Sequence, residues 1–399
     1  MNTGILGGAF DPIHAGHIAI AREALLALSL DRVLLMPSGK PPYKQCRAGR
    51  DDRMAMVEIA CAGQAGLFPC DVEIKRKGKT YTVETLEALK EKYPGDRFAY
   101  IIGADALDGL QKWYGIEKMA GMAAFAVVGR PGWNRADAES KARALREATG
   151  LEIIVTDIEG AQVSSGQVRA RVAEGKPIDG LVPDGVNDYI REHGLYLCNY
   201  SEAELLEKLR SAITVHRYHH TLGVADTAER LAARYGVDPK RARLAGLLHD
   251  CAKSLPYGEM RRLVSENVPD TDELELDAEP VLHAPAGMVL ARRDYGVRDE
   301  SILRAIRRHT LGGEDMSAMD ALIYVSDFIE PGRRPFPGLD EVREAAETDI
   351  FRAMRMSARL SADYLLSRGQ KPHPNSLKVM QQATEAHATP MKSQGGEAK

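Results

Sequence analysis

The chain has 399 residues, of which 44% are apolar, and its formal net charge at pH 7 is -4. This length exceeds that of a typical single core and predicts two domains, while the lack of a long basic run argues against general nucleic-acid binding. The five cysteines are odd in number and form no Cys-x-x-Cys pair, which is typical of a cytoplasmic protein rather than a disulfide scaffold. No stretch has the pattern of a signal peptide or of a membrane span of about 18 apolar residues, so we expect no membrane association.

The first half alternates short apolar runs, typical of strands, with longer runs of helical periodicity. The expected strands are residues 3–6, 32–36, 71–75, 97–102, 123–128 and 151–156, and the expected helices are residues 18–30, 50–62, 82–92 and 184–193. This alternation predicts an α/β domain with a doubly wound parallel sheet, in which ligands bind at the carboxyl ends of the strands.

The end of the first strand carries the most informative stretch, GGAFDPIHAGH over residues 7–17. Gly7 and Gly8 let the backbone approach a ligand closely, and the helix that starts after them offers unpaired N–H groups to a phosphate. His14 and His17 are three residues apart at this helix start, so both rings can face one side. There they can stabilise charge that develops on a phosphorus centre, and we expect both to be catalytic.

Further candidate ligand groups follow the later strands. Lys40 and Lys44 in PSGKPPYK can contact phosphates as point charges, although a solvated loop is the simpler interpretation of that segment. Trp113 follows a later strand and can either stack on a flat ring or pack in the core. Ser164 and Ser165 precede a helix, where serines commonly act as N-caps; with Arg169 they can also form a second phosphate grip.

Residues 1–198 resemble the bacterial nicotinate-nucleotide adenylyltransferases. The shared segments are GGAFDPIHAGH, PSGKPPYK, KTYTVETL, IIGADAL, GRPG, SSGQVR and VPDGV. The resemblance implies transfer of AMP from ATP to nicotinate mononucleotide, with release of pyrophosphate and with Mg²⁺ bridging the phosphates. Gly166 departs from the family, which usually has a threonine there, and the loss of its hydroxyl would loosen the grip on ATP.

The resemblance also implies roles for individual residues. Catalysis is expected from His14, His17, Lys40 and Arg169, and nucleotide binding from Gly7, Gly8, Phe10, Lys44, Thr82, Thr85, Gly103, Asp105, Trp113, Arg130, Ser164 and Ser165. An adenylyltransferase specific for pantetheine phosphate or nicotinamide mononucleotide is the alternative for this half.

Strand patterns end near residue 199, where we place the domain boundary. A capping box, Ser201-Glu202-Ala203-Glu204, starts a helix. Helical periodicity then extends over residues 205–213, 219–235, 239–249, 279–292, 300–309, 316–328 and 350–366. The prediction is an α/β domain over residues 1–198, an all-α domain over residues 199–383, and a disordered polar tail over residues 384–399.

Six potential metal ligands in the second half lie next to apolar residues. They are His220, His249, Asp250, His283, His309 and Asp327. Buried groups of this kind must be paired or bound to a metal, and six of them, with the adjacent doublet of His249 and Asp250, favour metal binding over isolated structural roles. Imidazole nitrogen and carboxylate oxygen suit iron, manganese or zinc, and these ligand types do not choose among the three metals. Our expectation is iron, with manganese or zinc as the alternatives.

Residues 205–380 resemble the HD phosphohydrolases, and among them the bacterial enzymes that split diadenosine tetraphosphate into two ADP. The shared segments are RYHHTLGV, GLLHDCAK, HAPAG, AIRRHTLG and SDFIEPGRR. The resemblance implies two metal ions held by the six residues, catalysis through Asp250, and phosphate contacts from Lys253 and Arg333. A nucleotide-sensing module that regulates the first half, or a hydrolase of (p)ppGpp, is the alternative, and homo-oligomerisation is left open.

Overall fold

The structure is a computed structural model that describes residues 1–39, 46–76, 78–130, 132–160 and 162–382. The chain divides into two compact units, Met1–Tyr196 and Leu197–Lys399. Lys40, Lys44 and the expected tail over residues 384–399 lie outside the described residues. Within those residues, no helix has both the length and the apolar character needed to cross a membrane.

The first unit is built on a six-stranded sheet in the order β3-β2-β1-β4-β5-β6, with all neighbours parallel. The strands are β1 (Asn2–Gly8), β2 (Arg32–Pro37), β3 (Leu67–Pro69), β4 (Arg97–Gly103), β5 (Ala123–Gly129) and β6 (Ile153–Glu159). The central strand β1 pairs with β2 on one side and β4 on the other, with Ile5 opposite both Leu34 and Tyr100. The doubly wound parallel sheet is therefore confirmed, and its strand order changes direction at β1, where such sheets bind ligands.

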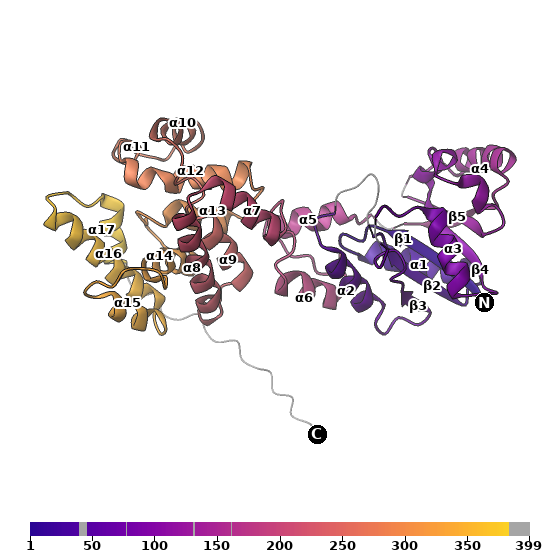
Figure 1. Ribbon diagram of the computed structural model, residues 1–399, viewed down its shortest axis with the longest axis horizontal. Helices are drawn as coiled ribbons and strands as arrows, with labels where there is room; N and C mark the ends of the chain where they lie inside the picture. The colour runs from indigo at the N-terminus through magenta and orange to yellow at the C-terminus, as the bar shows by residue number, and fades with distance from the viewer. Residues whose placement is uncertain (40–45, 77, 131, 161, 383–399) are drawn as a thin grey trace, which may run out of the picture. The chain divides into compact units, whose positions relative to one another are not determined.

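Helices accompany this sheet, as Figure 1 shows. They are α1 (Ala15–Ala27), α2 (Arg50–Cys61), α3 (Thr82–Lys92), α4 (Arg135–Thr149), α5 (Ser165–Ala173) and α6 (Asp184–Glu192), with short 3₁₀ turns between β4 and β5. Helix α4 was not anticipated, because alanines make up most of its buried side and give a weak periodic signal.

One expected strand of this unit is wrong. Residues 71–75 form a turn, in which the Lys75 N–H donates to the Asp71 carbonyl at 3.0 Å, and the edge strand is β3 instead. The alternation of apolar and polar residues suggested a strand with Val72 and Ile74 facing inward. The buried residue is Glu73 between them, and its carboxylate accepts a hydrogen bond from the Thr85 hydroxyl at 2.9 Å.

The described part of the second unit is helical. Its helices are α7 (Glu202–Ala212), α8 (Val215–Ala232), α9 (Pro239–Leu248), α10 (Tyr257–Asn267), α11 (Glu273–Leu276), α12 (Glu279–Arg293), α13 (Glu300–Arg308), α14 (Ala318–Ile329), α15 (Leu339–Ala346), α16 (Ile350–Ser367) and α17 (Pro374–Gln381). The predicted all-α architecture is confirmed, and the capping box at Ser201 and Glu204 starts α7.

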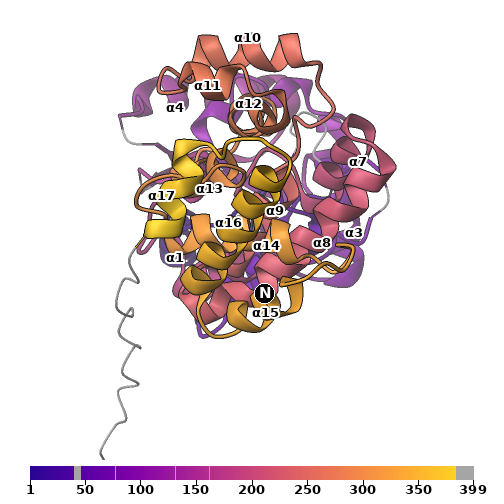
Figure 2. The same cartoon turned by 90° about the vertical axis from the view of Figure 1, so that its left-hand side faces the viewer.

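Helix α14 is the central element of this unit. Its residues 319–326 are all buried, because nearly every side chain on it is apolar, and it packs against α8, α9, α13, α15 and α16. Figure 2 looks onto the end of the unit where α15, α16 and α17 lie in front. A helix that is apolar all round belongs in the middle of a bundle, so polar groups on α14 are held in the interior unless they face a cavity.

Candidate functional sites

The first candidate site starts at the carboxyl end of β1. A Cβ atom on Gly7 would lie 2.8 Å from the Tyr100 hydroxyl, so glycine leaves room for the Tyr100 side chain of β4 there. The chain then turns through Phe10, whose φ of 46° is left-handed and whose buried ring meets the edge of the His17 ring, with centroids 4.8 Å apart. This turn delivers the chain to the start of α1 beside the sheet.

His14 and His17 lie together at that helix start. His14 is the N-cap residue of α1, and the two rings stack with their centroids 3.6 Å apart. The His14 backbone N–H donates to His17 Nδ1 at 3.2 Å, so in a neutral His17 ring the hydrogen is on Nε2, where it can be donated. Burial lowers the pKa of His14 to about 4, which keeps that ring neutral at pH 7.

The start of α5 adjoins the same loop. The Ser164 hydroxyl caps α5 by accepting from the Gln167 N–H at 3.2 Å. The Ser165 hydroxyl donates to the Pro12 carbonyl at 2.9 Å, and Arg169 Nη1 donates to the Asp11 carbonyl at 2.5 Å. Two helix N-termini are thereby fixed to one loop, which is an arrangement suited to a chain of phosphates.

Asp11 holds this loop together, and the sequence analysis missed its role. Its side chain is 1% exposed and accepts from the N–H groups of Arg47 and Ala48 at 2.9 and 3.0 Å and from the Tyr196 hydroxyl at 3.0 Å. Arg169 Nη1 lies 3.7 Å from the same carboxylate. Asp11 stands between a phenylalanine and a proline in the sequence, and a buried aspartate needs hydrogen-bond partners. That position could have suggested a buried carboxylate, but the sequence does not show which residues are its partners.

A buried arginine, Arg53, was also missed. It is 2% exposed, and its guanidinium donates to the carbonyls of Ala9, Ser38 and Gly39 at 2.8, 2.7 and 3.3 Å. These carbonyls follow the ends of β1 and β2, so Arg53 sets the path of both loops at the candidate site. Its position on α2 gave no motif by which sequence could identify it.

Three predicted nucleotide contacts lie beyond the ends of β4 and β5. Gly103 ends β4, and Asp105 follows it in a 3₁₀ turn. Asp105 and Arg130 form an ion pair of 3.0 Å with both side chains largely exposed, a type of pair that contributes little to stability.

Gly166 in α5 has only ordinary contacts around the position of a Cβ atom, at 3.8 Å or more, so space alone does not require glycine there.

The predicted aromatic and threonine contacts are partly built into the core. Trp113 is half-buried and meets the Tyr100 ring edge-on, with centroids 6.5 Å apart. Thr82 begins α3 and is half-buried, whereas Thr85, one turn later, is completely buried and donates to Glu73. Thr85 therefore bonds to the protein in this structure, and its predicted contact with a nucleotide stays a prediction.

The second candidate site draws on five helices of the second unit. His220 is on α8, His249 and Asp250 follow α9, His283 is on α12, His309 follows α13, and Asp327 is on α14. The structure brings these six residues together in three overlapping groups, within each of which the potential ligand atoms lie within 4.8 Å of one another. All are buried except Asp327, whose side chain is 24% exposed.

Asp250 lies in the middle of the cluster, with its two oxygens facing different histidines. Oδ1 is 3.0 Å from His283 Nε2 and 3.7 Å from His309 Nε2, while Oδ2 is 3.4 Å from His249 Nε2 and 3.7 Å from His220 Nε2. A carboxylate so placed has the geometry to bridge two cations.

The histidines are oriented as metal ligands usually are. His249 Nδ1 lies 2.6 Å from the Gly246 carbonyl and His309 Nδ1 lies 2.8 Å from the Ile306 carbonyl. A carbonyl can only accept, so each Nδ1 carries the hydrogen and each neutral ring presents the Nε2 lone pair to the cluster. His249 Nε2 is buried without a hydrogen-bond partner, and a metal ion fits this donor set because it would satisfy that atom.

The charges of the cluster also suit a metal. Burial raises the pKa of Asp250 and of Asp327, but the surrounding histidines outweigh it and hold both pKa values below their usual range. Burial lowers the pKa of His283 to about 4. At His249 the opposing effect of burial is outweighed by the Asp250 charge, which raises the pKa, so a metal ion would displace a proton there. Ionised carboxylates and a neutral imidazole are the protonation states that bind metal ions.

Three cationic side chains surround the cluster. Arg217 Nη1 lies 2.7 Å from Asp250 Oδ2, and Arg333 Nη2 lies 2.6 Å from the Asp327 carbonyl and 3.3 Å from its Oδ1. Lys253 Nζ lies 2.9 Å from His283 Nδ1. In this structure Lys253 thus contacts a histidine of the cluster, and its predicted contact with a phosphate stays a prediction. Arg217 was not among the predicted site residues, although it lies in the RYHHTLGV segment.

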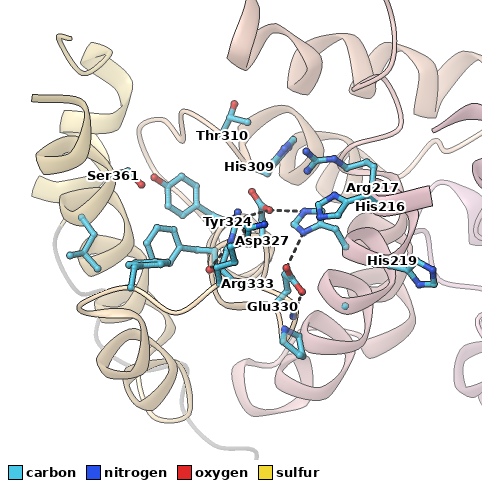
Figure 3. A pocket seen from close by; sticks show the side chains of 18 of the residues that line it. His216, Arg217, His219, His309, Thr310, Tyr324, Asp327, Glu330, Arg333 and Ser361 are labelled. Atoms are coloured by element: carbon cyan, nitrogen blue, oxygen red, sulfur yellow. Dashed lines mark hydrogen bonds and ion pairs between the residues drawn. The ribbon is translucent and has the colours of Figure 1, made fainter. Parts of the chain in front are cut away.

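A cavity of about 1510 Å³ opens beside the cluster, and Figure 3 shows part of its lining. His220, His309 and Asp327 lie on its wall together with Arg217 and Arg333. The lining also includes aromatic side chains, Tyr324, Phe328, Phe336 and Tyr364. Pockets of about 300–1,000 Å³ hold drug-sized ligands, so this cavity has room for a ligand larger than those.

Comparisons with known proteins divide the chain in the same way. The cytidylyltransferase-like family matches residues 5–171, and the HD domain family matches residues 217–354. A probable nicotinate-nucleotide adenylyltransferase of Synechococcus sp. (strain JA-3-3Ab) is 39% identical over 196 residues, covering 49% of this chain and 94% of the relative. A symmetrical bis(5'-nucleosyl)-tetraphosphatase of Bacillus subtilis (strain 168) is 42% identical over 174 residues, covering 44% of this chain and 92% of the relative.

One relative spans both halves. A probable nicotinate-nucleotide adenylyltransferase/Ap4A hydrolase of Mycoplasma genitalium is 27% identical over 334 residues, covering 83% of this chain and 87% of the relative. The name of this relative joins the two activities that the names of the half-length relatives carry separately.

Proposed function

The chain belongs to the nicotinate-nucleotide adenylyltransferase family in its first half and to the HD-domain family of symmetrical bis(5'-nucleosyl)-tetraphosphatases in its second, and we propose that it is one enzyme with two nucleotide reactions. We assign adenylyl transfer to residues 1–198 and hydrolysis to residues 199–383. We place the protein in the cytoplasm, where the free and buried thiols of Cys61, Cys70 and Cys251 would stay reduced.

The first reaction is transfer of AMP from ATP to nicotinate mononucleotide, giving nicotinate adenine dinucleotide and pyrophosphate. The observation that carries it is the meeting of two helix N-termini and two stacked histidines at the end of β1. The mononucleotide phosphate attacks the α-phosphorus of ATP, so the protein needs no nucleophile of its own. His17 can donate from Nε2 to the phosphate oxygens as charge develops, and Arg169 and the α5 N-terminus hold the leaving phosphates.

Magnesium fits this reaction, since Mg²⁺ bound with ATP would neutralise the charge of its phosphates. The remaining contribution of the chain is positioning. Asp11 and Arg53 fix the loops after β1 and β2, so that the donors point to one place before the substrates arrive.

Substrate competition tests the first reaction. We expect kcat/KM for nicotinate mononucleotide to exceed that for nicotinamide mononucleotide, because a site built for a carboxylate leaves donors unpaired when it binds the neutral amide. Equal values for the two nucleotides, or a preference for pantetheine phosphate, would refute the assignment.

The second reaction is hydrolysis of diadenosine tetraphosphate to two ADP. The observation that carries it is the cluster of four histidines and two aspartates around Asp250, which opens into a cavity with arginines and aromatic side chains on its wall. Two bound metal ions, iron in our proposal, would activate a water molecule and neutralise the inner phosphates. Arg217 and Arg333 place positive charge at the cavity side of the cluster, where the polyphosphate would lie, and the aromatic rings offer stacking surfaces for adenine.

Product analysis with metal analysis tests the second reaction. The full chain should carry two metal ions and release ADP as the nucleotide product. Release of AMP and ATP would mean attack on an outer bond, and a single metal per chain would overturn the two-metal site.

A further inference from the structure

The four histidines of the metal cluster differ in what holds the ring nitrogen that faces away from it. Backbone carbonyls hold Nδ1 of His249 and His309, and Lys253 lies against Nδ1 of His283. His220 is held by a carboxylate: its Nδ1 lies 3.2 Å from Oε1 of Glu330. Glu330 is absent from the predicted site residues.

The Glu330 carboxylate is buried in a space that two glycines leave open. It is 5% exposed, and its Oε2 accepts from the Gly332 N–H at 2.5 Å. A Cβ on Gly223, one turn after His220 on α8, would lie 2.9 Å from the same oxygen, and a Cβ on Gly332 would lie 3.0 Å from it. Two glycines thus leave space for this carboxylate.

The contact decides which nitrogen of His220 carries the hydrogen. A carboxylate accepts, so Glu330 requires the hydrogen on Nδ1, which leaves the Nε2 lone pair of a neutral ring for a metal. On the other side of the ring, Nε2 of His220 is buried without a hydrogen-bond partner, although Asp327 Oδ1 lies 3.0 Å from it. Without Glu330, nothing would hold the hydrogen of the neutral ring on Nδ1, and a hydrogen on Nε2 would block the metal position.

We propose that Glu330 is a positioning residue, which fixes the His220 ring and its tautomer so that Nε2 is available to a metal ion. The proposal rests on the metal-dependent hydrolysis proposed above. The turn after α14 that carries Glu330 also carries Arg333, which donates to the carbonyl of Asp327 at 2.6 Å. This turn therefore orients both His220 and Asp327. Removing the Glu330 side chain should lower the affinity for the metal ion held by those two residues more than the affinity for the ion near His283.

The tautomer of His220 in the metal-free full chain is the first test. Two-bond ¹H–¹⁵N spectra of histidine-labelled protein report it, with the His220 signals identified as those lost in His220→Gln. Wild type should show the hydrogen on Nδ1 at a pH where the ring is neutral. Glu330→Ala should shift it to Nε2. Glu330→Gln should do the same, because its single oxygen is needed by the Gly332 N–H and its NH2 group then faces Nδ1 as a donor.

Metal affinity is the second test, with Mn²⁺ as the probe and electron paramagnetic resonance as the readout. Glu330→Ala should weaken the binding of one of the two Mn²⁺ ions about 10–100-fold, the range for losing an outer partner of a ligating histidine. Glu330→Gln should weaken it similarly, because its NH2 group would leave the His220 hydrogen on Nε2. Glu344→Ala removes an exposed glutamate of α15 and serves as the matched control, with wild-type affinity expected.

A second variant covers the case in which Glu330→Ala does not fold. Gly223→Ala keeps the carboxylate but pushes it out of the space that the two glycines leave, and it should cause the same loss in smaller measure. An unchanged tautomer and unchanged Mn²⁺ affinity in a folded variant would overturn the positioning role. Failure of wild type to bind Mn²⁺, Fe²⁺ or Zn²⁺ would instead count against the proposed hydrolysis, and the tautomer would still decide the role of Glu330.

Discussion

Replacing Tyr196 by phenylalanine removes one hydroxyl from the site in the first unit. That hydroxyl donates to Asp11 at 3.0 Å, and both residues are buried, with 5% and 1% of their surface exposed. Burial, reinforced by the nearby Asp11 charge, raises the pKa of Tyr196, so the phenol remains a neutral donor over the usable pH range. The variant therefore tests whether a contact between the ends of this unit stabilises the loop after β1.

The expected loss of stability follows from what Asp11 keeps. The carboxylate retains the N–H groups of Arg47 and Ala48, so it does not become a buried charge without partners. The loss should be that of one hydrogen bond to a charged group, about 2 kcal/mol. A unit of this size loses about 2–4 °C of Tm for each kcal/mol, so Tm should fall by about 4–8 °C.

Tryptophan fluorescence can follow this unit alone in the full chain. The chain has two tryptophans, Trp113 and Trp133, and both are in the first unit. The matched control is Tyr189→Phe, because the Tyr189 hydroxyl also donates to an aspartate, Asp52, at 3.0 Å, but both groups are partly open to solvent. Water can replace that bond, so the control should lose less than about 1 kcal/mol.

Two outcomes would refute this reasoning. One is a loss below about 0.5 kcal/mol for Tyr196→Phe, the level of an ordinary surface substitution. The other is an equal loss in Tyr196→Phe and Tyr189→Phe, which would mean that burial of the Asp11 network adds nothing.

Four further predictions concern the two sites. His17→Ala should lower kcat of adenylyl transfer by about 10²-fold, the effect of losing one donor to the transition state, and an unchanged kcat would exclude that role. Burial lowers the pKa of His14 from 6.5 to about 4, so the unfolded chain binds the extra proton at a higher pH than the folded chain does. The free energy of unfolding should therefore be unaffected by His14 above pH 6.5 and fall as the pH drops toward about 4. Denaturation followed by tryptophan fluorescence should show a weaker fall for His14→Gln. Asp250→Ala should abolish hydrolysis and release metal while adenylyl transfer continues, and metal bound at the wild-type level would contradict its central place. His283→Ala should lose one ion preferentially, measured as metal per chain, and equal loss of both ions would argue against separate positions.

Several features could be predicted because they depend on residues close together in the chain. The stretch over residues 7–17 combines two glycines, a turn and a helix start, and each depends on local backbone preferences. The helices of the second unit follow from periodicity, and the polar residues His249, Asp250 and Asp327 stood out against apolar neighbours. Local pattern was misleading at residues 71–75, where the buried side chain proved to be Glu73.

The contacts that complete both sites join residues far apart in the chain. Asp11 meets Tyr196 across 185 positions, and His220 meets Glu330 across 110. Nothing in the local pattern of either partner predicts the other, because such pairs form only when separate elements pack together and a buried polar group must find a partner. The sequence by itself thus determined the fold class of each half and the chemical groups available for the two reactions. Only the tertiary structure decided which residues hold those chemical groups in place. The contacts depend on how the loop after β1 packs against Tyr196 and how α8 packs against the turn after α14.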